Sequence, residues 1–261
     1  MGRFKLYIEY EGTRYSGWQI QKNARTVQGA IDEAIRKVFD TAEFEFHGSG
    51  RTDAGVHALQ QTAHLDVQTV LAPEIIRMKL NDQLPADINI LEVEKAAASF
   101  HARHDAVARS YLYQISQRRT ALGKRYVWWV KDPLNVQAMQ EAAKLFVGMK
   151  DFRSFTDSDP EETSTKVLIY TAELKQEGSL LLFRLTGSHF IWKLVRRIVG
   201  VLVEVGRRKL TAAEIDAMFH RTSDVPAGLT APPSGLFLER VLYKGEQFPE
   251  AFSSVINIAH G

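Results

Sequence analysis

Apolar residues follow two different periods along the first hundred residues. Within 4–10 every second side chain is apolar, which predicts a strand, whereas within 27–39 apolar residues recur at helical spacing behind Thr26, a typical helix N-cap. The same patterns predict strands over 44–46, 63–67 and 88–93, and a helix over 73–82 that begins with a proline. The first half therefore has the order β-α-β-β-α-β.

This order begins again after residue 105. Periodicity predicts strands over 106–115, 166–175, 180–185 and 236–243, and helices over 135–147 and 190–205. Thr211 and Glu214 form the signature of a capping box at the start of a further helix. Two split β-α-β units predict an α+β fold of two tandem ferredoxin-like halves, 1–105 and 106–261. We expect the halves to share one continuous, mostly antiparallel sheet with helices on one face and a central cleft.

One polar segment lacks periodicity, and short basic clusters occur at several positions in the second half of the chain. The stretch 151–164 is polar and contains Pro160, so we expect a loop, either one that closes over a site or a plain surface connection. Basic residues are clustered at 118–119, 124–125, 196–197 and 207–209. Taken singly, such clusters are typical of solvated surface.

The composition excludes several classes of protein. Of the 261 residues, 45% are hydrophobic and 25% are charged, which is typical of a folded globular chain and not of a disordered, collagen-like or coiled-coil one. The absence of cysteine excludes disulfides, thiolate metal sites and a cysteine nucleophile. Residues 1–9 lack the apolar run of a signal peptide, and no segment reaches the roughly 18 apolar residues of a membrane span. We therefore expect a cytoplasmic protein without membrane contact, and the net charge of +2 does not by itself require a nucleic-acid partner.

The segment 48–57, Gly-Ser-Gly-Arg-Thr-Asp-Ala-Gly-Val-His, concentrates reactive side chains between two predicted strands. It is not a dinucleotide fingerprint, because Asp53 stands where that motif needs glycine and a strand follows where it needs a helix. It is not a P-loop, because Val56 and His57 replace the Lys-Ser/Thr pair. The sequence therefore offers no phosphate-loop cofactor site.

A metal site also lacks support in the sequence. No H-E-x-x-H motif occurs, and His101 and His104 have only Asp105 as a nearby acidic residue. What remains is Asp53, two positions after Arg51, in a loop whose glycines let the backbone approach a ligand. Asp53 is either a turn former or a carboxylate nucleophile that a nearby arginine keeps ionised. We expect no metal and no cofactor.

Five segments, in order along the chain, together match one known family. They are 50–58 (Gly-Arg-Thr-Asp-Ala-Gly-Val-His-Ala), 99–103 with 108–113, 151–155, 195–200 and 232–238. In these segments the chain resembles the tRNA pseudouridine synthase A family. The resemblance implies isomerisation of uridine to pseudouridine at position 38, 39 or 40 of the tRNA anticodon stem-loop. It also implies a homodimer that needs neither cofactor nor metal.

The resemblance also assigns roles to particular residues. It implies that Asp53 is the nucleophile, that Arg51 is the adjacent basic residue, that Tyr111 packs on the target base and that Arg196 pairs with Asp53. We expect RNA phosphates to contact a basic face drawn from Arg51, Arg103, Arg109, Arg118 and Arg119. Whether Asp53 attacks C1′ of the ribose or C6 of the base is left open. Two alternatives are a pseudouridine synthase for other RNA uridines and a non-catalytic RNA-binding module.

The two adjacent arginines of the helix expected over 190–205 occupy different positions on a helical wheel. Arg196 falls at the edge of the apolar arc, beside Trp192, so its stem can follow buried surface while its guanidinium reaches Asp53. Arg197 falls on the polar strip with Glu204, and we expect it to be a surface charge. The wheel therefore favours Arg196 as the functional arginine.

Overall fold

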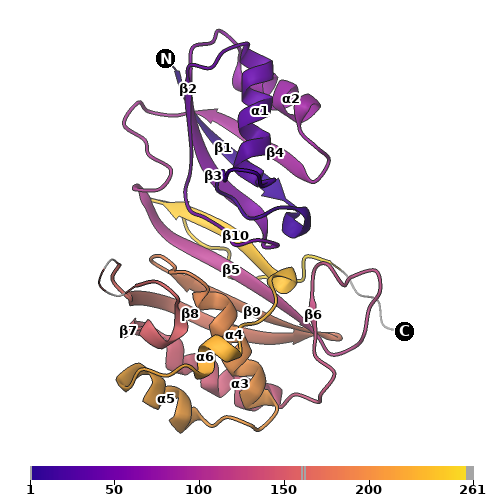
Figure 1. Ribbon diagram of the computed structural model, residues 1–261, viewed down its shortest axis with the longest axis vertical. Coiled ribbons are helices and arrows are strands. Elements are labelled where there is room, and N and C mark those ends of the chain that lie inside the picture. Colours follow the sequence, from indigo (N-terminus) through magenta and orange to yellow (C-terminus); the bar gives the residue numbers. More distant parts are fainter. Residues whose placement is uncertain (1, 160, 162, 257–261) are drawn as a thin grey trace. The chain divides into compact units, whose positions relative to one another are not determined.

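The alternating segment at the start of the chain forms β1 (Gly2–Tyr10), an inner strand of the sheet. The computed structural model describes residues 2–159, 161 and 163–256 (Figure 1). β1 pairs antiparallel with β3 (His57–Val67) and with β4 (Ile88–Lys95), and β2 (Phe44–Gly48) pairs antiparallel with β3. The resulting order β4-β1-β3-β2 is that of the split β-α-β unit expected from the sequence.

Two helices pack with this sheet. α1 (Val27–Phe39) begins after Thr26, whose Oγ1 accepts a hydrogen bond of 3.2 Å from the backbone N–H of Gly29. α2 (Pro73–Gln83) begins with proline, which has no N–H to leave unpaired in the first turn. The helices pack against each other, and α2 packs against β4 (Figure 1). The apolar faces predicted from spacing are buried and include Ile31, Ile35, Ile76 and Leu80.

β5 (Ala106–Ser116) begins a further run of strands in the sheet, with the order β5-β9-β8-β7. β8 (Lys166–Glu177) and β9 (Leu180–Gly187) form the expected antiparallel hairpin. β7 (Gly148–Asp151), antiparallel to β8, and the short β6 (Trp128–Trp129), parallel to β5, add to the predicted pattern. α3 (Val136–Ala143) packs against β8 and against α4 (Leu194–Gly206).

The chain between α4 and the last strand contains two short helices. α5 (Ala212–His220) begins with the expected capping box, in which the backbone N–H of Glu214 donates to Thr211 Oγ1 at 3.3 Å and that of Thr211 donates to Glu214 Oε2 at 2.8 Å. α6 (Val225–Gly228) and β10 (Leu236–Tyr243) follow. Single 3₁₀ turns lie at Gly12–Arg14, Lys144–Phe146, Arg153–Phe155 and Pro233–Gly235.

The described residues form two compact units. One comprises 2–107 and 237–248, and the other comprises 108–159, 161, 163–236 and 249–256. Most of β10 belongs to the first unit, where Phe237 and Leu238 pair parallel with His57 and Ala58 of β3. The α+β class with mostly antiparallel pairing is confirmed. The division into halves 1–105 and 106–261 stays a prediction.

No helix among the described residues is long and apolar enough to cross a membrane.

The segment 151–164, expected to be either a loop that closes over a site or a plain surface connection, is buried in part at its start. Asp151 ends β7, and Phe152 and Phe155 are fully buried. Both rings contact Phe219 of α5, with centroid separations of 5.5 and 5.7 Å. Two phenylalanines three positions apart therefore anchor the segment in the core, and its Pro160 lies outside the described residues.

Candidate functional site

The Asp53 loop, defined here as residues 49–56, connects β2 to β3 and is hydrogen-bonded to β3 at its start. The side chain of Gln61, fully buried on β3, accepts from Ser49 Oγ at 2.6 Å and donates to the carbonyl of Gly50 at 3.0 Å. The backbone N–H of Ser49 donates to the carbonyl of Thr62 at 2.8 Å. These bonds hold the loop in a single path as it leaves the strand.

The residue before Asp53 is anchored on two sides. The buried hydroxyl of Thr52 lies 2.7 Å from the hydroxyl of Tyr10, and its carbonyl accepts from the backbone N–H of Trp18 at 3.1 Å. Gly17 makes this approach feasible, since a Cβ there would lie 2.6 Å from the Thr52 carbonyl oxygen and the backbone φ is +95°. Asp53 is half-buried, and Arg51, on the other side of Thr52, is exposed.

The loop is also held after Asp53. The carbonyl of Asp53 accepts from the backbone N–H of Val56 at 3.2 Å in a turn where Gly55 has a φ of +78°. His57, only 1% exposed, follows the turn and its Nδ1 accepts from the backbone N–H of Gly12 at 3.0 Å. Asp53 therefore lies between two fixed points, which limits the directions its carboxylate can take.

Sequence reasoning missed the segment 11–18 that supports this loop. A Cβ on Gly12 would lie 1.9 Å from the carbonyl oxygen of Val56, so only glycine allows the two backbones to meet. Trp18, 3% exposed, packs beside Gly48, where a Cβ would lie 2.6 Å from its indole ring. The two glycines of the segment, at 12 and 17, were the available signal, because isolated glycines between an apolar strand and a helix mark close backbone approach.

Two predicted site residues lie on β5 and contact the same neighbouring segment. Tyr111 is half-buried, and the edge of its ring packs against Phe190 with centroids 4.8 Å apart and planes at 71°. Arg109 Nη1 donates to the carbonyl of Ser188 at 2.9 Å. The structure thus brings Arg109 and Tyr111 together beside 188–190.

Arg196 lies in the first turn of α4 and is bonded to the chain segment that follows α6. Its Nε donates to the carbonyl of Ala231 at 2.7 Å, and its own carbonyl accepts from the backbone N–H of Ala231 at 3.1 Å. The segment approaches so closely that a Cβ on Gly200 would lie 1.6 Å from the carbonyl oxygen of Leu229. Arg196 is half-buried, in agreement with its position on the wheel.

The expectation that Arg197 is a surface charge was wrong. Arg197 is 3% exposed and its guanidinium forms an ion pair with Asp157, which also binds the ammonium group of Lys193. The hydrogen bond from Lys193 and the positive charge of Arg197 lower the pKa of Asp157 despite its partial desolvation. The wheel failed here because the turn Arg153–Phe155 packs against α4 and covers part of its polar strip.

The remaining predicted residues are placed less tightly. Arg103 is exposed, and its backbone N–H donates to His101 Nδ1 at 3.1 Å. Arg51, Asp53 and Arg103 belong to one compact unit, and Arg109, Tyr111 and Arg196 to the other. That all six serve one centre stays a prediction. Among the described residues, no group of three or more His, Asp or Glu side chains is arranged to hold a metal ion.

Comparison with known proteins identifies the family. A family model described as tRNA pseudouridine synthase matches residues 6–105 and 142–244. These ranges include Asp53, Arg196 and the strand β9, which pairs with the strand of Tyr111; Tyr111 itself lies between the two ranges. The chain belongs to the tRNA pseudouridine synthase family. As a member of this family of isomerases it is an enzyme, and the matched ranges contain the whole Asp53 loop.

Full-length relatives agree with this assignment. The chain is 40% identical over 246 residues to tRNA pseudouridine synthase A of Geobacillus kaustophilus, covering 94% of this chain and 95% of that protein. It is 39% identical over 248 residues to tRNA pseudouridine synthase A of Bartonella tribocorum, covering 93% and 100%. A chain from the crystal structure of a Cbf5-Nop10-Gar1 complex is 14% identical, with 76% of this chain and 54% of that chain covered. Its TM-score of 0.32 is too low to inform the fold.

Proposed function

We propose that this protein isomerises uridine to pseudouridine in the anticodon stem-loop of tRNA, at position 38, 39 or 40, with Asp53 as the nucleophile. The observation that carries the proposal is the Asp53 loop. It holds one half-buried carboxylate between anchored neighbours inside the range matched by the family. The similarity to proteins named tRNA pseudouridine synthase A over almost the whole chain supports tRNA as the substrate.

A carboxylate acts as a nucleophile only when it is ionised and aimed. The bonds that Thr52 makes to Tyr10 and Trp18 fix the backbone next to Asp53, so little conformational freedom is lost when the substrate arrives. In a site from which RNA excludes water, a facing cation is needed to keep the carboxylate charged. We assign this task to Arg196, whose Nε is oriented by the Ala231 carbonyl.

The target uridine has to leave the base stack before the carboxylate can reach it. Extrusion costs a few kcal/mol and needs a replacement surface for the base. Tyr111 supplies such a surface, because contact with Phe190 restrains its ring from turning. Arg51 and Arg103 in one unit, and Arg109 in the other, are proposed to contact phosphates of the RNA.

The reaction rearranges bonds without net gain or loss of atoms. Asp53 attacks C1′ or C6, and the bond between C1′ and N1 breaks. The freed base turns so that C5 bonds to C1′, and the bond between Asp53 and the substrate breaks, which restores the carboxylate. C5 then loses its proton to solvent, and N1 gains one. No oxidant or reductant is required.

Further parts of the proposal rest on the family alone. We propose a homodimer in the cytoplasm, where tRNA is found, and size-exclusion chromatography with light scattering tests the dimer. The alternatives remain a synthase for other RNA uridines and a non-catalytic RNA-binding module. An ionisable carboxylate in an anchored loop favours an enzyme, because a carboxylate repels the phosphates that a simple binder needs to attract.

The test follows the hydrogen at C5, which the reaction releases to solvent. tRNA transcribed with tritium at uridine C5 is incubated with the wild-type enzyme and with Asp53→Asn. We expect release from the wild type and none from the variant, which keeps the size of the side chain but loses its charge. Asp32→Asn on α1, where Asp32 pairs with Arg36 at 2.8 Å, is the matched control and is expected to keep full activity.

Mapping the product separates the proposed target from the alternatives. Pseudouridine confined to positions 38–40 supports the proposal, and pseudouridine elsewhere supports the first alternative. Wild-type turnover by Asp53→Asn would refute the nucleophile assignment, and RNA binding by the wild type without tritium release would favour the binding module.

A further inference from the structure

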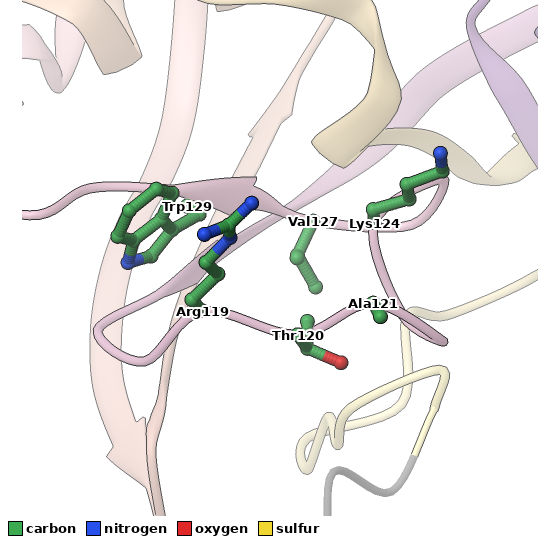
Figure 2. Close-up of a pocket in the computed structure, with 6 residues that line it drawn as sticks. All are labelled: Arg119, Thr120, Ala121, Lys124, Val127 and Trp129. Atoms are coloured by element: carbon green, nitrogen blue, oxygen red, sulfur yellow. The ribbon is translucent and has the colours of Figure 1, made fainter.

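A small pocket lies in the connection between β5 and β6, and none of the residues assigned above to catalysis lines it. It has a volume of about 310 Å³, near the lower end of the 300–1,000 Å³ usual for ligand pockets. The described residues that line it are Arg119, Thr120, Ala121, Lys124, Val127 and Trp129. Figure 2 shows Arg119 beside the indole ring of Trp129, with Lys124 on the other side of Val127.

Trp129 presents an aromatic surface to solvent at this pocket. It is 40% exposed, whereas Val127, which also lines the pocket, is 3% exposed and gives the pocket an apolar floor. The guanidinium carbon of Arg119 lies 5.7 Å from the centre of the indole ring, which is within the range of a cation–π contact. An exposed indole over an apolar floor suits a flat aromatic ligand.

The two cations that line the pocket, Arg119 and Lys124, are not neutralised by the part of the chain that the structure describes. The segment 118–125, Arg-Arg-Thr-Ala-Leu-Gly-Lys-Arg, contains four basic residues and no acidic one. No ion pair joins Arg119 or Lys124 to a carboxylate of residues 2–159, 161 or 163–256. Two unpaired cations beside an aromatic surface attract a ligand that is both anionic and aromatic.

The backbone around the pocket is held by hydrogen bonds and is therefore formed before a ligand arrives. The N–H of Gly123 donates to Thr120 Oγ1 at 3.1 Å, and the N–H of Tyr126 donates to the carbonyl of Gly123 at 2.9 Å. On the side of β6, Ser234 Oγ donates to the carbonyl of Val127 at 3.2 Å. Such preorganisation lowers the entropy lost on binding.

We propose that this pocket binds one unpaired nucleotide of the tRNA substrate, with its base on Trp129 and its phosphate on Arg119 and Lys124. The inference rests on the proposed function in so far as tRNA is the partner, and it adds a second RNA contact outside the catalytic residues. A nucleotide of the RNA combines a flat ring with a phosphate, as this lining requires. The volume of about 310 Å³ is of the order of a single nucleotide.

The test removes the two positive charges and the indole ring in separate variants of the full chain, and it uses an unmodified tRNA transcript as the probe. Arg119→Gln with Lys124→Gln removes both cations. Trp129→Leu removes the ring, and Trp129→Phe keeps an aromatic face. Lys144→Gln is the matched charge control, because Lys144 is exposed and already paired with Glu141 at 2.8 Å.

Filter binding between roughly 50 and 200 mM salt measures the dissociation constant and its salt dependence. We expect the double variant to lower the log–log slope by roughly 0.7, as for one phosphate contact on a single strand. Trp129→Leu is expected to weaken binding roughly tenfold and to lower kcat/KM by the same factor. Trp129→Phe is expected to bind almost as well as the wild type. Lys144→Gln is expected to change neither the slope nor the affinity.

The proposal is overturned if the double variant and Trp129→Leu, shown by circular dichroism to be folded, bind tRNA like the wild type. It is also overturned if Trp129→Phe weakens binding as much as Trp129→Leu, because a ring would then not be the feature that matters. A wild-type protein that binds tRNA but forms no pseudouridine would instead refute the proposed function, and the binding comparison would still decide the pocket.

Discussion

His64 makes the stability of this protein depend on pH in a way that can be calculated from its surroundings. His64 lies on β3 at 1% exposure, and its ring contacts those of His101 and His47 at centroid separations of 4.7 and 5.2 Å. Its Nδ1 accepts from the backbone N–H of Ala102 at 3.2 Å. Burial, reinforced by the positive charges of His101, Arg3 and His47, lowers the pKa of His64 from 6.5 to about 4, and Asp66 opposes the change only in part.

The sign and size of the effect follow from linkage. Between pH 6.5 and about 4, the unfolded chain binds a proton at His64 that the folded chain does not, so the free energy of unfolding falls as the pH falls through this window. Above the window the residue is neutral in both states and the effect vanishes. At 1.36 kcal/mol per pH unit, the difference between the two pKa values corresponds to an upper limit of about 3 kcal/mol.

Urea denaturation at a series of pH values from about 4 to 7.5 measures this contribution. We expect His64→Asn, whose side-chain oxygen can accept the Ala102 N–H, to flatten the dependence of the free energy of unfolding on pH by up to about 3 kcal/mol. The control is His220→Asn, since His220 is exposed on α5 beside Asp216 and its loss is expected to leave the curve unchanged.

Two results would refute the reasoning. One is a wild-type and a His64→Asn curve that run parallel from pH 7 to 4. The other is a titration of the His64 ring proton, followed by NMR, with a midpoint near the ordinary 6.5. Either would mean that burial does not keep His64 neutral.

Three further predictions concern the site. Arg196→Ala is expected to lower kcat by roughly a hundredfold with little change in tRNA affinity, because the arginine is assigned to Asp53 and not to the RNA. Single-turnover kinetics and filter binding measure the two quantities, and an equal loss of affinity would contradict this. Asp157→Asn is expected to destabilise the fold by about 3 kcal/mol in urea, because it leaves the buried Arg197 charge without its carboxylate, and an unchanged unfolding midpoint would contradict it. Turnover is expected to survive EDTA and dialysis, and a loss that a transition metal restores would count against the mechanism.

Much of the fold was determined by local sequence. The alternation in 4–10 spans seven residues, and the N-cap Thr26 and the capping box of Thr211 with Glu214 each act over four. The sequence alone therefore contains all the information they need. The short strands β6 and β7 were missed because two to four residues are too few for a period to be recognised.

The candidate site could be predicted only in part from the sequence. The sequence identified Asp53 by excluding other motifs and by resemblance, yet nothing local indicated that Thr52 is fixed by Tyr10 and Trp18 or that Gly12 meets Val56. These contacts join residues 34 to 44 positions apart, and they exist only once β1 and β3 are paired.

Tertiary structure decided which polar residues are buried. On the wheel Arg197 belongs to a polar strip, but in the folded chain its guanidinium binds the carboxylate of Asp157, which lies forty residues earlier in the sequence. His64 is polar by composition, and its neutrality depends on burial among His47 and His101 from other segments. A side chain's own type and its helical or strand neighbours set its preference, whereas its dielectric surroundings and charge partners come from distant segments that only folding brings together.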